Sequence, residues 1–221
     1  MTKPRRAFIF DMDGTIVDNM AYHTRSWIAF FERRGRTIDA DKFFRATAGR
    51  QGKEIMRAYL GDDLSDHDNA VLNEEKEAVY RELYEPYRKA VKGFDNLVAN
   101  AQLRDVALAV ATAAPDANIG FTLDGLNLRQ HFHAIVGAAD VARGKPEPDA
   151  FLMAAKRCGV EPKDCIVFED APLGVEAALR AGMRAVALTT TLPADAFAHF
   201  DNVIHIVKDF SELPVEALFR N

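Results

Sequence analysis

The chain has 221 residues with 48% hydrophobic and 28% charged content, a composition typical of a globular protein large enough to bury a core without disulfides or a structural metal. Its 28 basic and 33 acidic residues give a net charge of −5, which argues against nucleic acid as the main partner. The two cysteines favour a reducing compartment, and no apolar run is long enough for a signal peptide or a membrane span, so we expect a cytoplasmic protein without a membrane partner.

The first predicted element is a short apolar strand over residues 6–10, directly followed by two aspartates. Beyond it, apolar side chains recur at helical spacing, with no strand-like alternation between residues 18 and 90. The predicted helices cover residues 20–34, 40–47, 53–60 and 66–89. Pro86 is expected to disturb or end the last of them. Residues 18–90 are therefore interpreted as a helical insert.

After residue 93 the pattern changes to short, continuously apolar runs, which are typical of strands covered on both faces. The predicted strands cover residues 106–111, 133–137, 165–168, 184–188 and 203–207, and helices between them cover residues 115–127, 148–159 and 172–181. Strands that alternate with helices indicate a parallel α/β sheet. We therefore predict an α/β core formed by residues 1–17 and 91–221, with residues 18–90 as a separate helical domain.

Polar residues stand where several of the predicted strands end. In a parallel sheet, ligands bind outside the carboxyl ends of the strands, so these residues should meet at one edge. They are Asp11 and Asp13 after the first strand, Thr112 and Ala113 after the second, Lys145 downstream of the third, and Glu169 and Asp170 after the fourth. The sequence thus predicts a site that combines several acids with one lysine and one hydroxyl.

Asp11 and Asp13 lie two positions apart, so in an extended segment both carboxylates point to the same side. Gathered carboxylates repel one another unless a hard divalent cation such as Mg²⁺ joins them, and with that ion and Lys145 the pocket would hold a phosphate dianion. Asp11 would then attack phosphorus, while Asp13 would protonate the leaving oxygen and later take a proton from water. Lys145, the Thr112 hydroxyl and loop amides would stabilise the phosphoryl oxygens.

The motifs DMDGT, AT, GKP and FED, in this order, resemble those of the haloacid dehalogenase superfamily of phosphotransferases. Nearly the whole chain is similar to the β-phosphoglucomutase-like branch, whose members are mutases and small-metabolite phosphatases. The resemblance implies a Rossmann-like core with a helical cap, Asp11 as the nucleophile and Asp13 as the acid and base. It also implies Mg²⁺ held by Asp11, the main-chain carbonyl of Asp13, and Asp170, with Glu169 orienting the metal shell.

The residues expected to bind substrate are His23, Arg50, Lys53, Thr112, Ala113 and Lys145. In the mutases, an arginine of a G-x-x-R stretch in the cap holds the phosphate that is not transferred. Here that stretch reads Gly49-Arg50-Gln51-Gly52-Lys53, so basic residues are present but shifted. This departure weakens the assignment as a mutase.

We therefore expect a Mg²⁺-dependent phosphatase that acts through an aspartyl-phosphate on a small phosphorylated metabolite, with sugar phosphates as the leading class. The alternative is a β-phosphoglucomutase, which would interconvert β-glucose 1-phosphate and glucose 6-phosphate. A remote alternative is an enzyme similar to phosphonoacetaldehyde hydrolases, because Lys53 lies about where those enzymes carry a Schiff-base lysine, although Asp13 argues against it. A non-catalytic metabolite-binding relative is equally remote. A monomer or a homodimer is expected.

Several residues also have simpler interpretations. Asp170 is placed to be the N-cap of the helix that begins near Pro172. Lys76 stands in the charged run NEEKEAV and is interpreted as an exposed surface residue. Phe30 and Phe31 are expected to pack inside the helical domain, and Cys158 and Cys165 are expected to be inert core thiols.

Overall fold

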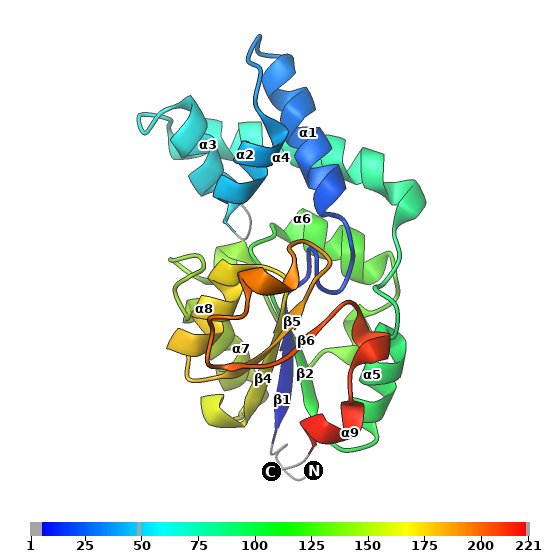
Figure 1. The fold of residues 1–221 in the computed structure, drawn as a ribbon. Helices are drawn as coiled ribbons and strands as arrows, with labels where there is room; N and C mark the ends of the chain where they lie inside the picture. Colours follow the sequence, from blue (N-terminus) through cyan, green and yellow to red (C-terminus); the bar gives the residue numbers. More distant parts are fainter. Residues whose placement is uncertain (1–5, 48–49, 220–221) are drawn as a thin grey trace.

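The protein is described by a computed structural model that covers residues 6–47 and 50–219. Its centre is a parallel sheet with the strand order β3-β2-β1-β4-β5-β6 (Figure 1). The strands are β1 (Ala7–Phe10), β2 (Ala107–Ala111), β3 (Ala134–Val136), β4 (Cys165–Glu169), β5 (Arg184–Leu188) and β6 (Val203–Val207). The predicted α/β class and every predicted strand are confirmed, with strand ends shifted by at most one residue.

Helices cover both faces of the sheet, which explains why its strands are continuously apolar. These helices are α5 (Phe94–Gln102), α7 (Asp149–Cys158), α8 (Pro172–Arg180) and α9 (Val215–Leu218). One face carries large side chains such as Phe10 and packs against α5 and α9. The other face carries smaller side chains such as Ala109 and packs against α7 and α8. The carboxyl ends of the strands are left free to carry polar groups.

Helix α5 is not predicted from the sequence, although it has a buried apolar stripe. The stripe consists of Phe94, Leu97, Val98 and Ala101. The residue before the helix is Gly93, which has a φ of 86° and no side chain with which to cap the first turn. A helix without an N-terminal signal is hard to recognise, because capping residues are the usual mark of its start. The four-residue helix α9 is also unpredicted.

The predicted helical segment over residues 115–127 is confirmed from Asp116 to Asp124, but it does not stay α-helical throughout. The segment begins with α6 (Asp116–Ile119) and continues as a π-helical turn over Gly120–Asp124. The guanidinium group of Arg88 donates a hydrogen bond of 2.7 Å to the carbonyl of Phe121. A side chain that takes a carbonyl from the helical ladder interrupts regular α-helical bonding at that point.

The chain between β1 and α5 forms a layer of helices beyond the carboxyl edge of the sheet (Figure 1). They are α1 (Met20–Glu32), α2 (Ala40–Thr47), α3 (Gly52–Leu60) and α4 (Asp66–Tyr84). An aromatic cluster fills the space between these helices, and it includes Phe30 and Phe31 as expected. The predicted helical cap is therefore confirmed as an architecture, and it has a hydrophobic interior of its own.

The helical cap begins and ends at adjacent points of the fold. Val17 forms an antiparallel bridge with Ala90, and the N–H of Val91 donates a hydrogen bond of 2.8 Å to the carbonyl of Ile16. The chain therefore leaves the sheet and returns to it at nearly the same place. Domain limits at residues 18 and 90 stay a prediction, which this pairing supports.

Helix α4 belongs to both parts of the molecule. It packs on α1 and α3, and Tyr80 and Tyr84 in its second half lie fully buried in the hydrophobic cluster of the sheet. The helix ends at Tyr84, and a 3-10 turn over Glu85–Tyr87 contains Pro86. The expected effect of this proline is confirmed, because it cannot continue the helical hydrogen bonding.

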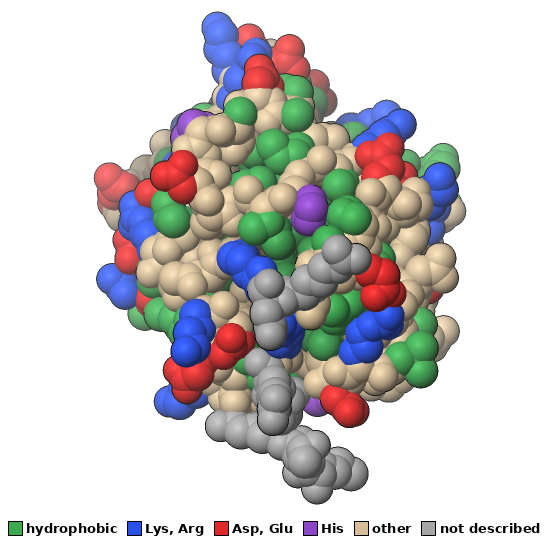
Figure 2. Space-filling model, turned by 60° about the horizontal axis from the view of Figure 1, so that its bottom comes forward, with side chains coloured by type: hydrophobic (Ala, Val, Ile, Leu, Met, Phe, Trp, Pro, Cys, Tyr) green, Lys and Arg blue, Asp and Glu red, His purple; other side chains and the backbone are tan. Residues whose placement is uncertain are grey.

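The surface away from the cap shows no dominant charge. On the face in Figure 2, acidic, basic and hydrophobic side chains are interspersed. In the part of the chain that the structure describes, no helix is both long and apolar enough to cross a membrane. Cys158 and Cys165 are free and buried, and burial raises the pKa of their thiols to about 11 and about 12. The expected inert core thiols are confirmed.

Candidate active site

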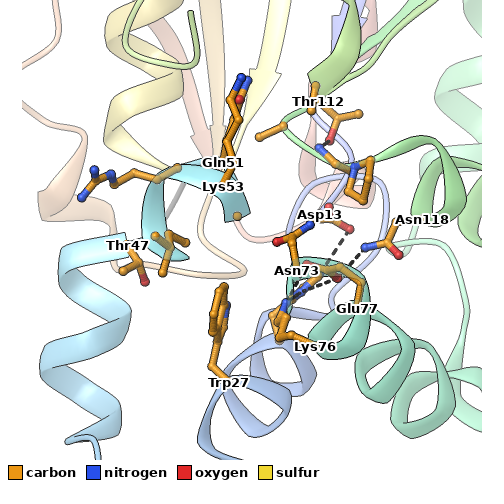
Figure 3. Close-up of a pocket in the computed structure, with 18 of the residues that line it drawn as sticks. Asp13, Trp27, Thr47, Gln51, Lys53, Asn73, Lys76, Glu77, Thr112 and Asn118 are labelled. Atoms are coloured by element: carbon orange, nitrogen blue, oxygen red, sulfur yellow. Dashed lines mark hydrogen bonds and ion pairs between the residues drawn. The ribbon is translucent and has the colours of Figure 1, made fainter. Parts of the chain in front are cut away.

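A cavity of about 520 Å³ lies between the helical cap and the carboxyl ends of the strands. Figure 3 shows Asp13 and Thr112 from the core and Trp27 and Gln51 from the cap around this space. The sequence-predicted residues that line it are Asp11, Asp13, His23, Arg50, Lys53, Thr112, Ala113, Glu169 and Asp170. Lys145 is not part of this lining, but it is hydrogen-bonded to Asp11 and Glu169, which are.

Lys145 is the buried cation on the core side of the site. Its ammonium group donates hydrogen bonds to the carboxylates of Asp11 and Glu169, the latter at 2.5 Å. Burial lowers the pKa of Lys145, but the charges of Asp11 and Glu169 outweigh burial and raise that pKa well above its ordinary value. The side chain is therefore a permanent positive charge beside Asp11.

The carboxyl groups around Lys145 outnumber its one ammonium group. Burial raises the pKa of Asp11 well above its ordinary value, and the attraction of Lys145 does not offset this effect. Burial also raises the pKa of Asp170, and the charge of Glu169 raises it further. Three buried carboxylates thus share one ammonium group. Such a surplus favours the binding of a cation.

The main chain at Gly14 also fits a metal site. A Cβ at Gly14 would lie 2.0 Å from a carboxylate oxygen of Asp170, and Gly14 has a φ of +85°. The peptide that carries the Asp13 carbonyl therefore lies against the Asp170 carboxylate, and only glycine allows this approach. Among residues 6–47 and 50–219, no three His, Cys, Asp or Glu side chains form a metal cluster by themselves. A cation held here needs a main-chain oxygen as well as side chains.

Asp13 occupies a different environment from Asp11. Asn19 donates a hydrogen bond of 2.6 Å to its carboxylate, and Nε2 of His23 lies 3.7 Å from the same oxygen. Burial raises the pKa of Asp13, but the proximity of His23 and the bond from Asn19 outweigh burial. The charge of Lys76 adds to their effect, and the pKa of Asp13 lies below its ordinary value. The two aspartates are therefore shifted in opposite directions.

Thr112 lies buried at the wall of the cavity, directly after β2. Its hydroxyl oxygen accepts a hydrogen bond of 3.1 Å from the N–H of Ala114. The bond fixes the position of the oxygen and leaves the hydroxyl proton for a ligand. Ala113 and Ala114 also line the cavity but add no polar side chain. This wall therefore offers one hydroxyl and main-chain amides.

Lys76 contradicts the prediction of an exposed surface residue. Its side chain is 1% exposed, and its ammonium group lies 2.9 Å from Oε1 of Glu77 and 2.9 Å from Nδ1 of His23. It also lies 4.8 Å from the ring centroid of Trp27, within cation–π distance. The prediction is wrong because the charged run contributes residues to two sides of α4. Glu74 is exposed, whereas Lys76 lines the cavity.

Glu77 connects the cap to the core. Its carboxylate accepts a hydrogen bond of 2.7 Å from Asn118 in α6, and Arg81 of α4 donates one of 2.8 Å to the same Asn118. The contacts around Lys76 and Glu77 are visible in Figure 3. Burial raises the pKa of Glu77, but the charges of Lys76 and His23 outweigh burial and lower it. Glu77 is therefore an ionised bridge between the two parts.

Arg50 and Lys53 lie at the start of α3, near solvent. The Nε atom of Arg50 is 3.8 Å from a carboxylate oxygen of Glu54, and its side chain is 36% exposed. Lys53 is exposed. Among the described residues, neither cation forms a hydrogen bond or ion pair with the acids at the strand ends. Gly49, in the same sequence stretch, lies outside the described residues.

Asn19 is part of the site but is not predicted from the sequence. It is fully buried, accepts a hydrogen bond of 3.0 Å from the N–H of Gly14, and donates to Asp13 and to the Tyr80 hydroxyl, both at 2.6 Å. Asn19 directly precedes α1, where an asparagine usually indicates a helix cap. Its side chain makes no capping bond. The sequence signal at Asn19 therefore indicates a helix cap, whereas in the structure the side chain binds Asp13, Gly14 and Tyr80.

The prediction that Asp170 caps α8 is wrong. The N-cap of α8 is Ala171, and its first turn begins with Pro172. Asp170 instead accepts a hydrogen bond of 3.1 Å from the hydroxyl of Thr15, another residue that the sequence does not single out. The carboxylate is therefore turned toward the loop after β1 rather than along the helix.

A helical cap above paired strand-end acids defines a class of capped α/β enzymes whose chemistry is carried by carboxylates. Comparison with protein families agrees with this class. The family model described as haloacid dehalogenase-like hydrolase matches residues 5–182. The chain belongs to this family and is an enzyme.

Relatives define the branch of the family. The chain is 35% identical over 206 residues to validoxylamine A 7'-phosphate phosphatase of Streptomyces hygroscopicus subsp. limoneus, which covers 93% of this chain and 94% of that protein. It is 35% identical over 178 residues to fructose-1-phosphate phosphatase YqaB of Escherichia coli strain K12, with 80% and 93% covered. A crystal structure of β-phosphoglucomutase from Clostridium difficile matches with a TM-score of 0.84 and 26% identity, covering 97% of this chain and 95% of that one. The chain thus belongs to the β-phosphoglucomutase-like branch.

Proposed function

We propose that the protein is a Mg²⁺-dependent phosphatase of small phosphorylated metabolites, mainly sugar phosphates, which works through an aspartyl-phosphate on Asp11. One observation carries the proposal. Asp11 and Asp13 line the same cavity, yet Asp11 is bonded to a permanent cation and Asp13 to neutral and cap-derived groups. Paired acids in opposite environments suit opposite roles. The names of the phosphatase relatives support it. We place the enzyme in the cytoplasm, as a monomer or a homodimer.

In the first step, a carboxylate oxygen of Asp11 forms a bond to phosphorus while the bond from phosphorus to the substrate oxygen breaks. Asp13 gives a proton to that departing oxygen. Lys145 holds Asp11 in place, and the Thr112 hydroxyl donates to a phosphoryl oxygen.

In the second step, water attacks the phosphorus of the aspartyl-phosphate, and the bond to Asp11 breaks to release inorganic phosphate. Asp13 takes the proton of the water, and its lowered pKa keeps it in the carboxylate form that this step needs. The proton gained here is the one that Asp13 gives to the next leaving group. His23 and Asn19 hold the Asp13 carboxylate between the two steps.

Mg²⁺ would be held by Asp11, the main-chain carbonyl of Asp13, and Asp170. When bound, the ion would neutralise phosphate charge beside the acids. Glu169 accepts hydrogen bonds of 2.9 Å from the N–H groups of Asp170 and Ala171. These bonds fix the main chain that carries Asp170, so Glu169 would orient the metal site without binding the ion directly.

A β-phosphoglucomutase is the second candidate, favoured by the similarity to a solved enzyme of that name. In that reaction the phosphoryl group on Asp11 passes to a sugar instead of water. A role as a phosphonoacetaldehyde hydrolase is disfavoured, because Lys53 is exposed and a Schiff-base lysine needs a desolvated setting.

The test uses purified protein with Mg²⁺, β-glucose 1-phosphate, and a panel of sugar phosphates, nucleotides and pyrophosphate. Released phosphate and glucose 6-phosphate are both followed. Asp11→Asn should lower kcat by about 10⁴-fold or more, because it removes the nucleophile. The matched control Asp18→Asn changes an exposed aspartate seven positions along and should leave kcat within about twofold.

Phosphate release from a few panel members, lost in Asp11→Asn and on chelation of Mg²⁺, would support the phosphatase. Glucose 6-phosphate without free phosphate would establish the mutase instead. Full turnover by Asp11→Asn would overturn the mechanism for both.

A further inference from the structure

We propose that the cap side of the cavity contains a subsite for the hydroxyl groups of an uncharged polyol or sugar, built from the side-chain amides of Gln51, Asn69 and Asn73. The inference rests on the proposed function, because it names the part of the substrate that lies away from the reacting phosphate. The substrate is then a monophosphate whose remaining part carries several hydroxyls and no second charge.

Each of these amides has a buried oxygen without a hydrogen-bond partner among the described residues. Gln51 and Asn69 are 2% and 3% exposed, and all three residues line the cavity. In residues 6–47 and 50–219, seven buried side-chain atoms are unpaired in this way, and four of them, including Nε2 of His23, belong to this one cavity. Buried polar atoms nearly always have partners. Their concentration on one wall indicates a ligand that supplies the missing donors.

The contacts of Asn69 and Asn73 define what this wall offers. The amide nitrogen of Asn69 donates a hydrogen bond of 2.9 Å to the main-chain carbonyl of Lys53, so the oxygen is the free atom. Asn73 follows one turn later in α4. Its side-chain oxygen lies so close to Gly52 that a Cβ on that glycine would be 2.0 Å from it. Both acceptors therefore lie where α4 meets the first turn of α3.

Gln51 brings the same chemistry to the seam between cap and core. It is the N-cap residue of α3, but its side chain makes no capping hydrogen bond. The side chain of Gln51 lies close to Gly144, the residue before Lys145, because a Cβ on that glycine would be 3.2 Å from Cγ of Gln51. Figure 3 shows Gln51 and Asn73 on the same space as Asp13. The amides thus lie within one ligand's reach of the acids at the strand ends.

The groups around this wall fit a hydroxyl better than the other ligand chemistries. Carbonyl oxygens of amides repel phosphate and carboxylate, which have no protons to donate. The buried cation Lys76 is already paired with Glu77, so a second phosphate finds no unpaired buried cation on the described wall. Arg50 and Lys53 also line the cavity and disfavour a cationic amine. A hydroxyl both donates to an amide oxygen and accepts from an amide nitrogen.

Apolar side chains line the same cavity, among them Trp27, Phe43 and Ile55. Trp27 is visible beside the amides in Figure 3. A polyol or a sugar ring presents both hydroxyl groups and C–H surface. A wall that combines unpaired amides with apolar side chains therefore matches such a ligand better than it matches a purely polar or a purely apolar ligand.

The test compares Gln51→Met and Asn73→Leu, which keep side-chain size but remove the amides, with wild type. The controls Gln102→Met and Asn96→Leu make the same changes at exposed positions of α5. For glucitol 6-phosphate, each cavity variant should lower kcat/KM about ten- to hundred-fold. For p-nitrophenyl phosphate, which offers no hydroxyls beyond the phosphate, kcat/KM should stay within about threefold, and the controls should change neither value.

Binding is measured separately by titration calorimetry on Asp11→Asn protein carrying the same substitutions. Protein with Gln51 and Asn73 intact should bind glucitol 6-phosphate more tightly than hexyl phosphate and fructose 1,6-bisphosphate. The cavity variants should lose this preference. The subsite is overturned if the variants leave the preference intact, or if they weaken p-nitrophenyl phosphate turnover equally. If no phosphate ester is hydrolysed in an Asp11-dependent way but the binding preference holds, the proposed function fails and the subsite stands.

Discussion

The sheet core and the helical cap both bury charged side chains, and they do so in opposite ways. In the core, the carboxylates of Asp11, Glu169 and Asp170 gather at strand ends, and Lys145 is the one buried cation beside them among the described residues. In the cap, Lys76 lies in the middle of α4 and is matched by the adjacent Glu77. The core therefore has more carboxyl groups than cations, which raises the pKa of Asp11 and Asp170, whereas the charges of the cap balance each other.

The difference teaches how to interpret buried charge. An unbalanced cluster is unstable by itself, so it indicates a ligand that completes it. A balanced pair needs no ligand and serves to position its neighbours, here His23 and Asn118. Among the described residues of the cap, the unpaired buried atoms are three amide oxygens and Nε2 of His23. Under the two proposals above, the two sides of the cavity would bind different parts of one substrate.

The largest expected effect comes from breaking the core cluster with Lys145→Met. Without Mg²⁺, the free energy of unfolding should fall by about 5 kcal/mol, because Asp11 and Glu169 lose their buried cation. Mg²⁺ should restore part of the loss. Urea denaturation with and without the ion measures both, and Lys156→Met on the exposed face of α7 is the control. A loss below about 1 kcal/mol would contradict an electrostatically held core.

Lys76→Met should have a smaller effect and should not respond to Mg²⁺. We expect a loss of about 3 kcal/mol, since Glu77 is left buried without its cation. Adding Glu77→Gln should recover part of that loss. Hydrogen exchange should accelerate in α1 to α4 before the sheet opens. Dependence of this variant on Mg²⁺ would show that the cap charges are not self-contained.

Asn118→Ala should have the smallest effect of the three, about 2 kcal/mol, because it removes one hydrogen bond to an ionised carboxylate and one from a guanidinium group. The loss should be accompanied by faster hydrogen exchange at the second half of α4. The same exchange pattern in wild type and variant would mean that Asn118 does not join the cap to the core.

Most of the fold is predictable from the sequence, because strands buried on both faces leave continuous apolar runs. The acids of the core follow from the same rule, since ligand-binding residues gather where such strands end. Asp11, Asp13 and Asp170 need only this position and their chemistry to be found, whereas Lys145 lies in a loop after β3 and is singled out by the order of the motifs around it. Their proposed roles stay a prediction for experiment.

The polar interior of the cap is not predictable in this way. The face of α4 that is buried depends on contacts with α1 and α6, which lie far away in sequence. Lys76 thus looks like any lysine of a charged helix, and Asn19 looks like an ordinary cap. The unpaired amides of Asn69 and Asn73 become visible only when every hydrogen-bond partner is known.

Because Val17 pairs with Ala90, the two ends of the helical cap lie next to each other. An insertion whose two ends meet puts no tension on β1, so its length and sequence can change while the strand register stays fixed. A transplant of the helical cap from one scaffold to another would still have to carry Tyr80 and Tyr84, because the sheet relies on them for packing. The fold thus permits the helical cap to be exchanged while the strand-end residues stay in place, provided that Tyr80 and Tyr84 are kept.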